Sequence, residues 1–254
     1  MAYTSLTDVP HNLKEGIDWL IALRGTDAEK NLKAMGEALY KFLADKPIGK
    51  TQVPALEKIK HISKQFIANP ELKEMWPANE LLRRFKGPMS KKGPGCLASC
   101  FGASLESDYK NVVRTKGLTA ETIAKKLRKL VNGCEKFLEK IKSPDQYKPS
   151  YTSEATWDVS CSNNPEACAV VLVGIAPMLY TGLRCLREAS HDDTLPVSPF
   201  APCTILGNVL KAVGYERSEC CAKISGSYVF KALGNVKFQM LVTLYDLAGF
   251  WAFY

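Results

Sequence analysis

The chain of 254 residues contains 46% apolar and 24% charged residues, which is typical of a folded globular protein and excludes a disordered one. Its 17 glycines and 14 prolines show no period, so fibrous and collagen-like proteins are excluded as well. A chain of this length can bury a hydrophobic core without disulfides, as one large domain or two smaller ones.

The formal charge of +8 is spread unevenly along the chain. Residues 1–150 carry 27 basic and 17 acidic side chains, whereas residues 151–254 carry 7 and 9. A positive field attracts phosphate-rich partners or an anionic surface, but lysines also form the solvated polar faces of amphipathic helices. The basic first half is consistent with both interpretations.

The first half shows apolar residues at helical spacing. Asp8 followed by Pro10 predicts the first helix start, because aspartate caps free backbone N–H groups and proline fits the first turn. Further helices follow, one of them interrupted at Pro77, and the Gly- and Pro-rich residues 86–95 predict a loop. The expected helices cover residues 8–24, 27–46, 54–68, 72–85 and, with the strongest apolar stripe, 119–142.

The second half begins with a polar crossover at residues 143–162 and continues with the most apolar helix, which starts at Pro165. Gly174 and Pro177 interrupt its apolar run, and the run is short for a bilayer. We therefore expect a buried core helix and no transmembrane segment. Three prolines predict an irregular loop at 196–202, and shorter helices are expected at residues 206–214, 225–233 and 236–251.

These elements predict an all-α fold, a multi-helix bundle with no substantial sheet. The only run that fits a buried strand is residues 170–173. We expect either two packed sub-bundles, a basic one at 1–145 and an apolar one at 160–254, or one continuous domain. All four tryptophans are expected in the core: Trp19, Trp76, Trp157 and Trp251.

The sequence contains no motif of a catalytic centre. The stretch at Gly93, Pro94 and Gly95 lacks the downstream Gly-Lys-Ser/Thr of a P-loop, and neither HExxH nor GxSxG occurs. Cys96 and Cys100 form half of a zinc pattern, but no second cysteine pair or nearby histidine completes it. We expect no enzymatic activity, no catalytic or metal-binding residue, no cofactor and no nucleic-acid-binding module.

A basic cluster surrounds the predicted loop at 86–95. With Phe85 as a stacking group, this cluster can bind phosphates of a partner or serve as a basic targeting signal. The alternative is a solvated helix end, where cations stabilise the negative end of the helix dipole. The candidate anion- or partner-contact residues are Arg83, Arg84, Lys86, Lys91 and Lys92.

Nine cysteines are present, and Cys161 with Cys168 can close a short loop by a disulfide in an oxidising compartment. In a reducing compartment cysteines act as small apolar residues, as expected for Cys134 and Cys185. The N-terminus has neither a basic nor an apolar signal region. The sequence therefore predicts no signal peptide and a cytoplasmic start.

The C-terminus is unusually aromatic, with four aromatic side chains in the last five residues. Leu244, Leu247, Ala248 and Trp251 share one helical face, which needs a second apolar surface. This end docks in a groove of the chain itself, binds a partner, or belongs to a longer chain. We expect the first, with the helix packed on residues 119–142 and Trp251 buried.

Four segments carry a family resemblance: residues 5–20 (SLTDVPHNLKEGIDWL), 153–158 (SEATWD), 165–169 (PEACA) and 244–254 (LYDLAGFWAFY). Together they resemble the multigene families of piroplasm (Babesia-like) parasites that include or neighbour the variant erythrocyte surface antigens. The first segment is the most specific, and the resemblance runs nearly end to end. Members are often longer, with coiled-coil arrays and a C-terminal membrane anchor. The resemblance implies a non-enzymatic antigen or host-interaction protein with protein partners, and export or association with the infected cell.

The alternative function is an intracellular helical adaptor that binds proteins or anionic surfaces through its basic N-terminal half. The two hypotheses differ in the state of the cysteines. An extracellular form is expected to contain disulfides in its second half, whereas a cytosolic adaptor is expected to keep all nine thiols reduced. Neither the identity of the partner nor the oligomeric state follows from the sequence.

Overall fold

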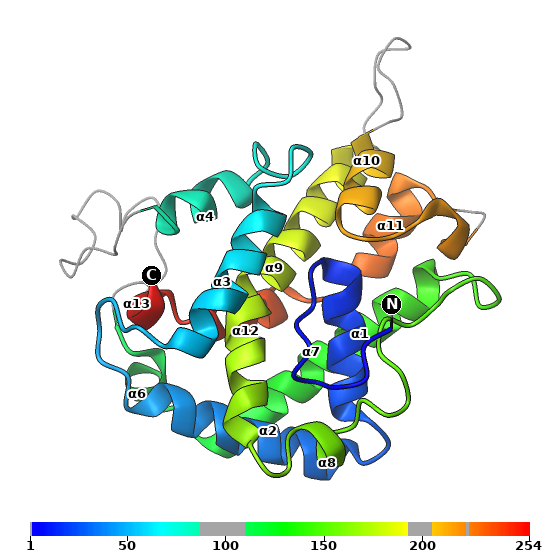
Figure 1. The fold of residues 1–254 in the computed structure, drawn as a ribbon. Coiled ribbons are helices and arrows are strands. Elements are labelled where there is room, and N and C mark those ends of the chain that lie inside the picture. Colours follow the sequence, from blue (N-terminus) through cyan, green and yellow to red (C-terminus); the bar gives the residue numbers. More distant parts are fainter. Residues whose placement is uncertain (1, 87–109, 193–204, 222–223) are drawn as a thin grey trace.

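The computed structural model describes residues 2–86, 110–192, 205–221 and 224–254, and it confirms the predicted all-α fold (Figure 1). These ranges contain no sheet, only two isolated bridges, which join Tyr3 to Tyr151 and Lys142 to Cys220. The loop predicted at 86–95 lies outside the described residues except for its first residue, and the loop at 196–202 lies entirely outside them.

Helix α1 (Leu13–Arg24) begins later than predicted. The side chain of Asn12 caps it by accepting a hydrogen bond from Glu15 N at 2.9 Å. Asp8 instead accepts a hydrogen bond from Ser5 N, at 3.1 Å, in the preceding turn. A capping residue followed three positions later by glutamate is itself a start signal, and this second signal determines where the helix begins.

Helices α2 (Ala28–Ala44) and α3 (Pro54–Ile67) lie where they were predicted. Asp27 caps α2, and α3 begins with a proline in its first turn. Helix α4 (Ala78–Arg84) is shorter than predicted, because residues 70–77 form turns.

Trp76 corrects the expectation that all four tryptophans lie in the core. It is 47% exposed, and the guanidinium carbon of Arg184 lies 4.4 Å from the centroid of its ring. The other three tryptophans are buried. Trp76 precedes α4 in the turn segment, where the default expectation that a tryptophan packs in the core does not hold.

Helix α7 (Ala120–Ile141) confirms the strongest predicted stripe and is capped by Thr119. The short α6 (Val112–Thr115) precedes it, and α8 (Trp157–Ser160) ends the crossover that follows. All apolar positions of the stripe are buried. The amphipathic pattern therefore identified the face of α7 that packs on the core.

The crossover between α7 and α8 is held on the N-terminal part of the chain. Asp18 accepts hydrogen bonds from Tyr147 Oη at 2.6 Å and from Ser150 N at 2.8 Å. Tyr3 N donates to Ser150 O at 2.8 Å, and Thr152 N donates to Tyr3 O at 2.9 Å. Burial raises the pKa of Asp18, against the effect of these hydrogen bonds.

The C-terminal part corrects the prediction of one last helix over 236–251. The structure divides it at Gly249, whose φ of 65° lies in the left-handed region that favours glycine. Trp251 is 1% exposed, which confirms its predicted burial. The helices here are α10 (Ile205–Ala212), α11 (Gly226–Leu233), α12 (Phe238–Leu247) and α13 (Phe250–Phe253), with a 3₁₀ turn at Arg217–Glu219.

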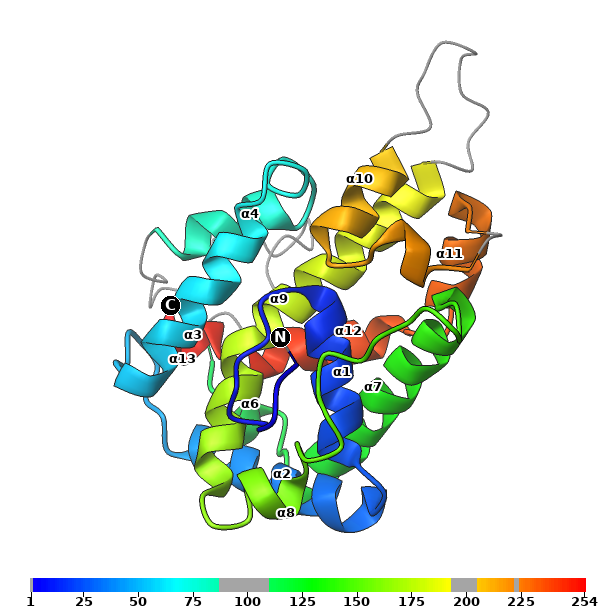
Figure 2. The ribbon, with the colours of Figure 1, turned by 45° about the vertical axis from the view of Figure 1, so that its right-hand side comes forward.

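Helix α9 (Pro165–Asp192) lies at the centre of the fold (Figures 1 and 2). Helices α1 to α4, which precede it, and α10 to α12, which follow it, all pack against it. It is long and apolar enough to cross a membrane, but 89% of its most apolar 18-residue stretch is buried inside the protein. Helix α12 packs against α7, as predicted, and also against α9.

Helices α3 and α9 cross closely at Gly174. A Cβ atom at this position would collide with the Ile59 side chain, so the crossing requires glycine. At the same point Ser63 Oγ donates a hydrogen bond to Gly174 O at 2.6 Å. These contacts fix the position of α3, which carries much of the site described below.

One hydrophobic core joins the two halves of the sequence. Buried side chains from residues 1–145 and from residues 160–254 belong to the same contiguous cluster. Helix α2 packs against both α7 and α9, and so contacts elements from each half.

Candidate anion-binding pocket

One face of α3 carries a row of polar side chains. Glu57, Lys60, His61 and Lys64 follow one another at steps of three, one and three residues, which places them on one side of a helix. All four line a pocket that also contacts the end of α4 and the C-terminal segment. Both ribbon views show α13 beside α3 (Figures 1 and 2).

Lys60 attaches the C-terminal segment to α3. It is 8% exposed, and its Nζ donates to Phe253 O at 2.6 Å and to Glu57 Oε1 at 2.9 Å. The same ammonium lies 4.6 Å from the centroid of the Tyr254 ring, a cation–π contact. The charge of Lys60 is therefore balanced within the protein.

Aromatic side chains form one wall of the pocket and position the end of α4. The Phe85 ring meets the Tyr254 ring edge-on, with 5.0 Å between centroids. The guanidinium carbon of Arg84 lies 5.5 Å from the centroid of the Phe250 ring. These contacts couple the two residues at the end of α4 to the aromatic C-terminal segment.

The pocket has a volume of about 280 Å³ and a strongly basic lining. Glu57 is the single acidic side chain among its described lining residues, and it pairs with Lys60. The remaining cations therefore leave the pocket with a net positive charge. The basic side chains that line it, apart from His61, are Lys50, Lys60, Lys64, Arg84 and Lys86.

Tyr254, at the aromatic wall of this pocket, carries a hydroxyl with unused hydrogen-bonding capacity. It is buried, and the described part of the chain offers it no hydrogen-bond partner. Burial raises the pKa of Tyr254, so the hydroxyl stays protonated at neutral pH and can donate. A buried donor without an acceptor costs free energy.

The structure places only part of the predicted basic cluster in this pocket. Arg84 and Lys86 line it, whereas Arg83 is exposed and pairs with a glutamate of its own helix at 3.4 Å. Lys91 and Lys92 lie outside the described residues.

Sequence reasoning missed the contribution of α3 to the pocket. Lys60, His61 and Lys64 carried a signal, because residues spaced by three and four share a helix face. The proximity of this face to Arg84 and Lys86 depends on the fold of the C-terminal segment between them. No local pattern in the sequence indicates that contact.

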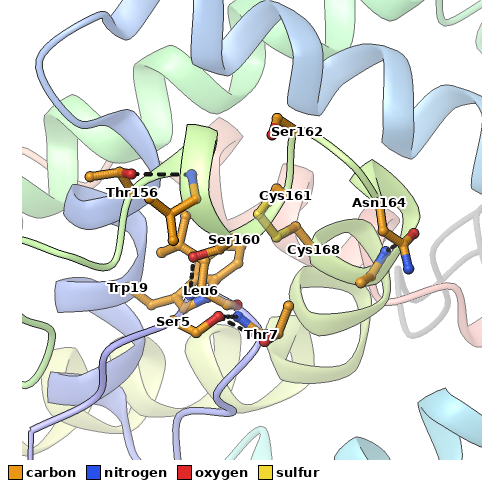
Figure 3. The surroundings of a disulfide bond; sticks show 12 residues. Ser5, Leu6, Thr7, Trp19, Thr156, Ser160, Cys161, Ser162, Asn164 and Cys168 are labelled. Atoms are coloured by element: carbon orange, nitrogen blue, oxygen red, sulfur yellow. Dashed lines mark hydrogen bonds between the residues drawn. A yellow bond between two sulfur atoms is a disulfide. The ribbon is translucent and has the colours of Figure 1, made fainter.

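A disulfide joins Cys161, at the end of α8, to Cys168 in the first turns of α9 (Figure 3). The two Cα atoms are 6.0 Å apart, within the usual range for a disulfide, and both residues are fully buried. Beside it, Leu6 N donates to Ser160 Oγ at 2.9 Å, and Trp19 Nε1 donates to Leu6 O at 2.8 Å. The disulfide thus lies where the N-terminal segment, α1, α8 and α9 meet.

Three further cysteines of the described chain are buried free thiols: Cys134, Cys185 and Cys220. Burial raises the pKa of Cys134 and of Cys185 to about 12, so both stay protonated at neutral pH. Within the described ranges, His, Cys, Asp and Glu form no group of three that could hold a metal ion. Cys96 and Cys100, the half of a zinc pattern, lie outside these ranges.

Comparisons with known proteins assign no family to the chain. No family model matches the sequence, no curated protein matches it, and no solved structure matches the fold. The resemblance to the parasite families described above stays a prediction.

Proposed function

We propose that the chain is a non-enzymatic binding protein of the antigen or host-interaction type and that it works in an oxidising compartment. The observation that carries this proposal is the disulfide between Cys161 and Cys168. Disulfides persist in secreted and cell-surface proteins and are rare in reducing compartments. The resemblance to variant erythrocyte surface antigen families supports the same class of function.

The buried thiols support a binding role over a catalytic one. A cysteine nucleophile needs thiolate character and access, whereas Cys134 and Cys185 are buried with a raised pKa. A basic pocket without a described metal cluster is suited to holding an anionic group of a partner.

The test of this proposal is the redox state of the cysteines in the native cell. Cells that contain the full chain are lysed in denaturant that contains an alkylating reagent, which blocks buried as well as exposed thiols, and unreduced peptides are then identified by mass spectrometry. We expect a peptide pair linked through Cys161 and Cys168, and an epitope-tagged copy exported or associated with the infected red cell. Cys134, a buried free thiol, serves as the internal control, since it should be alkylated once the protein is denatured.

The second candidate is an intracellular adaptor that binds proteins or anionic surfaces through its basic N-terminal half. The basic pocket favours it, because all five Lys and Arg side chains of its lining belong to residues 1–150. Alkylation of both Cys161 and Cys168 on lysis in denaturant, with no linked pair, would contradict the first proposal and support this one.

A further inference from the structure

We propose that the pocket between α3, α4 and α13 is a binding site for a small phosphate monoester. The site does not depend on the compartment in which the chain works, because none of its lining side chains takes part in the disulfide. The proposal therefore goes beyond the function proposed above, and its test has a separate outcome.

The first argument is the balance of charge. Lys60 and Glu57 neutralise each other at 2.9 Å. Lys50, Lys64 and Lys86 line the same pocket, and no carboxylate of the described chain forms an ion pair with them. Like charges brought together without counterions repel one another, and an anion bound between them removes this repulsion.

The second argument is the kind of anion that fits. A carboxylate carries one charge and two oxygens, whereas a phosphate monoester carries up to two charges and three free oxygens. Lysines from three separate segments, Lys50, Lys64 and Lys86, line the pocket. The several cations of this pocket therefore match a phosphate better than a single carboxylate.

The third argument concerns the rest of the ligand. Phe85, Phe253 and Tyr254 give the pocket an apolar wall, and the buried Tyr254 hydroxyl has no acceptor in the described part of the chain. The volume of about 280 Å³ is close to the lower end of ligand-binding pockets. A small organic group that carries a phosphate matches these dimensions and this basic and aromatic lining.

The test measures binding of glycerol 3-phosphate to the full chain by isothermal titration calorimetry at low ionic strength, above the second phosphate pKa of about 6. Wild-type protein should bind at micromolar to millimolar concentration, and glycerol should not bind. Lys64→Ala should raise Kd at least about tenfold, because it removes a charge-assisted contact. The matched control is Lys58→Ala, an exposed lysine on α3 that does not line the pocket and should leave Kd unchanged.

A second arm identifies the source of the phosphate. Flotation of the protein with vesicles that contain phosphatidic acid, compared with phosphatidylcholine alone, tests a lipid headgroup that is also a phosphate monoester. Binding to either probe that is lost in Lys64→Ala and kept in Lys58→Ala supports the site, and the probe that binds identifies the source. Failure of both probes, or an equal loss in both variants, would overturn the proposal, since nonspecific charge would then explain the binding. Matching circular dichroism spectra of the variants keep the comparison independent of folding.

Discussion

Lys60 connects α3 with the C-terminal segment in the basic pocket. It donates to Phe253 O and to Glu57 and lies over the Tyr254 ring. Since the lysine is almost fully buried, its aliphatic stem also packs against the protein. One side chain thus links the charge of α3 to the position of the C-terminal segment.

We predict that Lys60→Ala destabilises the fold by about 1–3 kcal/mol, because it leaves the carbonyl of Phe253 without its donor. Urea denaturation followed by circular dichroism measures the change. Lys58→Ala on the exposed side of the same helix should stay within about 0.5 kcal/mol of wild type. Equal stabilities of Lys60→Ala and wild type would show that the hydrogen bond contributes nothing.

The buried thiols lead to a second prediction. Burial raises the pKa of Cys134 and Cys185 to about 12, so the reactive thiolate is almost absent below pH about 9. In the native protein both should resist iodoacetamide at neutral pH, while Cys221, which is only partly buried, should react. Mass spectrometry of the alkylated peptides measures this. Rapid native labelling of Cys134 would contradict its position in the core.

At the scale of elements, the crossing of α3 and α9 depends on the absence of a side chain at Gly174. Gly174→Ala should cost about 1–3 kcal/mol, because the added methyl group overpacks the contact with Ile59. The control is Gly207→Ala in α10, where no described atom lies within 4 Å of the new methyl group. That change should stabilise the protein by about 0.4–1 kcal/mol, since alanine favours a helix more than glycine does. Thermal melting distinguishes the opposite signs.

The aromatic C-terminal segment leads to a fourth prediction. Trp251→Ala should cost about 3–5 kcal/mol, because it leaves a cavity in the core, and deletion of residues 245–254 should cause aggregation or a large fall in Tm. Phe238→Ala is the matched aromatic control, since Phe238 is 67% exposed. A truncated chain that stays soluble and equally stable would show instead that the segment is a tail for a partner.

At the scale of the molecule, the shared core predicts cooperative unfolding. Circular dichroism reports all helices, and fluorescence reports buried Trp19, Trp157 and Trp251, which come from both halves. The two signals should have the same midpoint in urea, and fragments 1–145 and 160–254 expressed alone should not fold. Two separate transitions would show that the halves are independent sub-bundles.

The sequence predicted the elements better than it predicted their junctions. The apolar stripe of α7 was predictable from the sequence, because the positions on one face are apolar and buried. The division of the last helix could not be predicted, because a glycine within an apolar pattern is also tolerated inside a helix. Only the left-handed φ of Gly249 reveals the break. Trp76 was misplaced for a related reason, since it lies in turns that follow no helical period.

The candidate site was predictable only in part, for a topological reason. Arg84 and Lys86 lie within three residues of each other, so composition alone identified them. Lys50 and Lys64 line the same pocket because of tertiary contacts that involve the C-terminal segment. These residues are too far from Arg84 and Lys86 in the sequence for a local pattern to relate them. Only the folded structure therefore reveals that α3 contributes to the pocket.

The central position of α9 has a consequence for the synthesis of the chain. Chains emerge from the ribosome N-terminus first, so helices α1 to α4 are available before this 28-residue apolar helix appears. They compete with any nearby bilayer for the same apolar surface, which is long enough to be accepted as a membrane span. A nascent chain shortened so that it begins after residue 86 would lack that intramolecular cover. Its most apolar helix would then partition into membranes or into aggregates instead of the folded core.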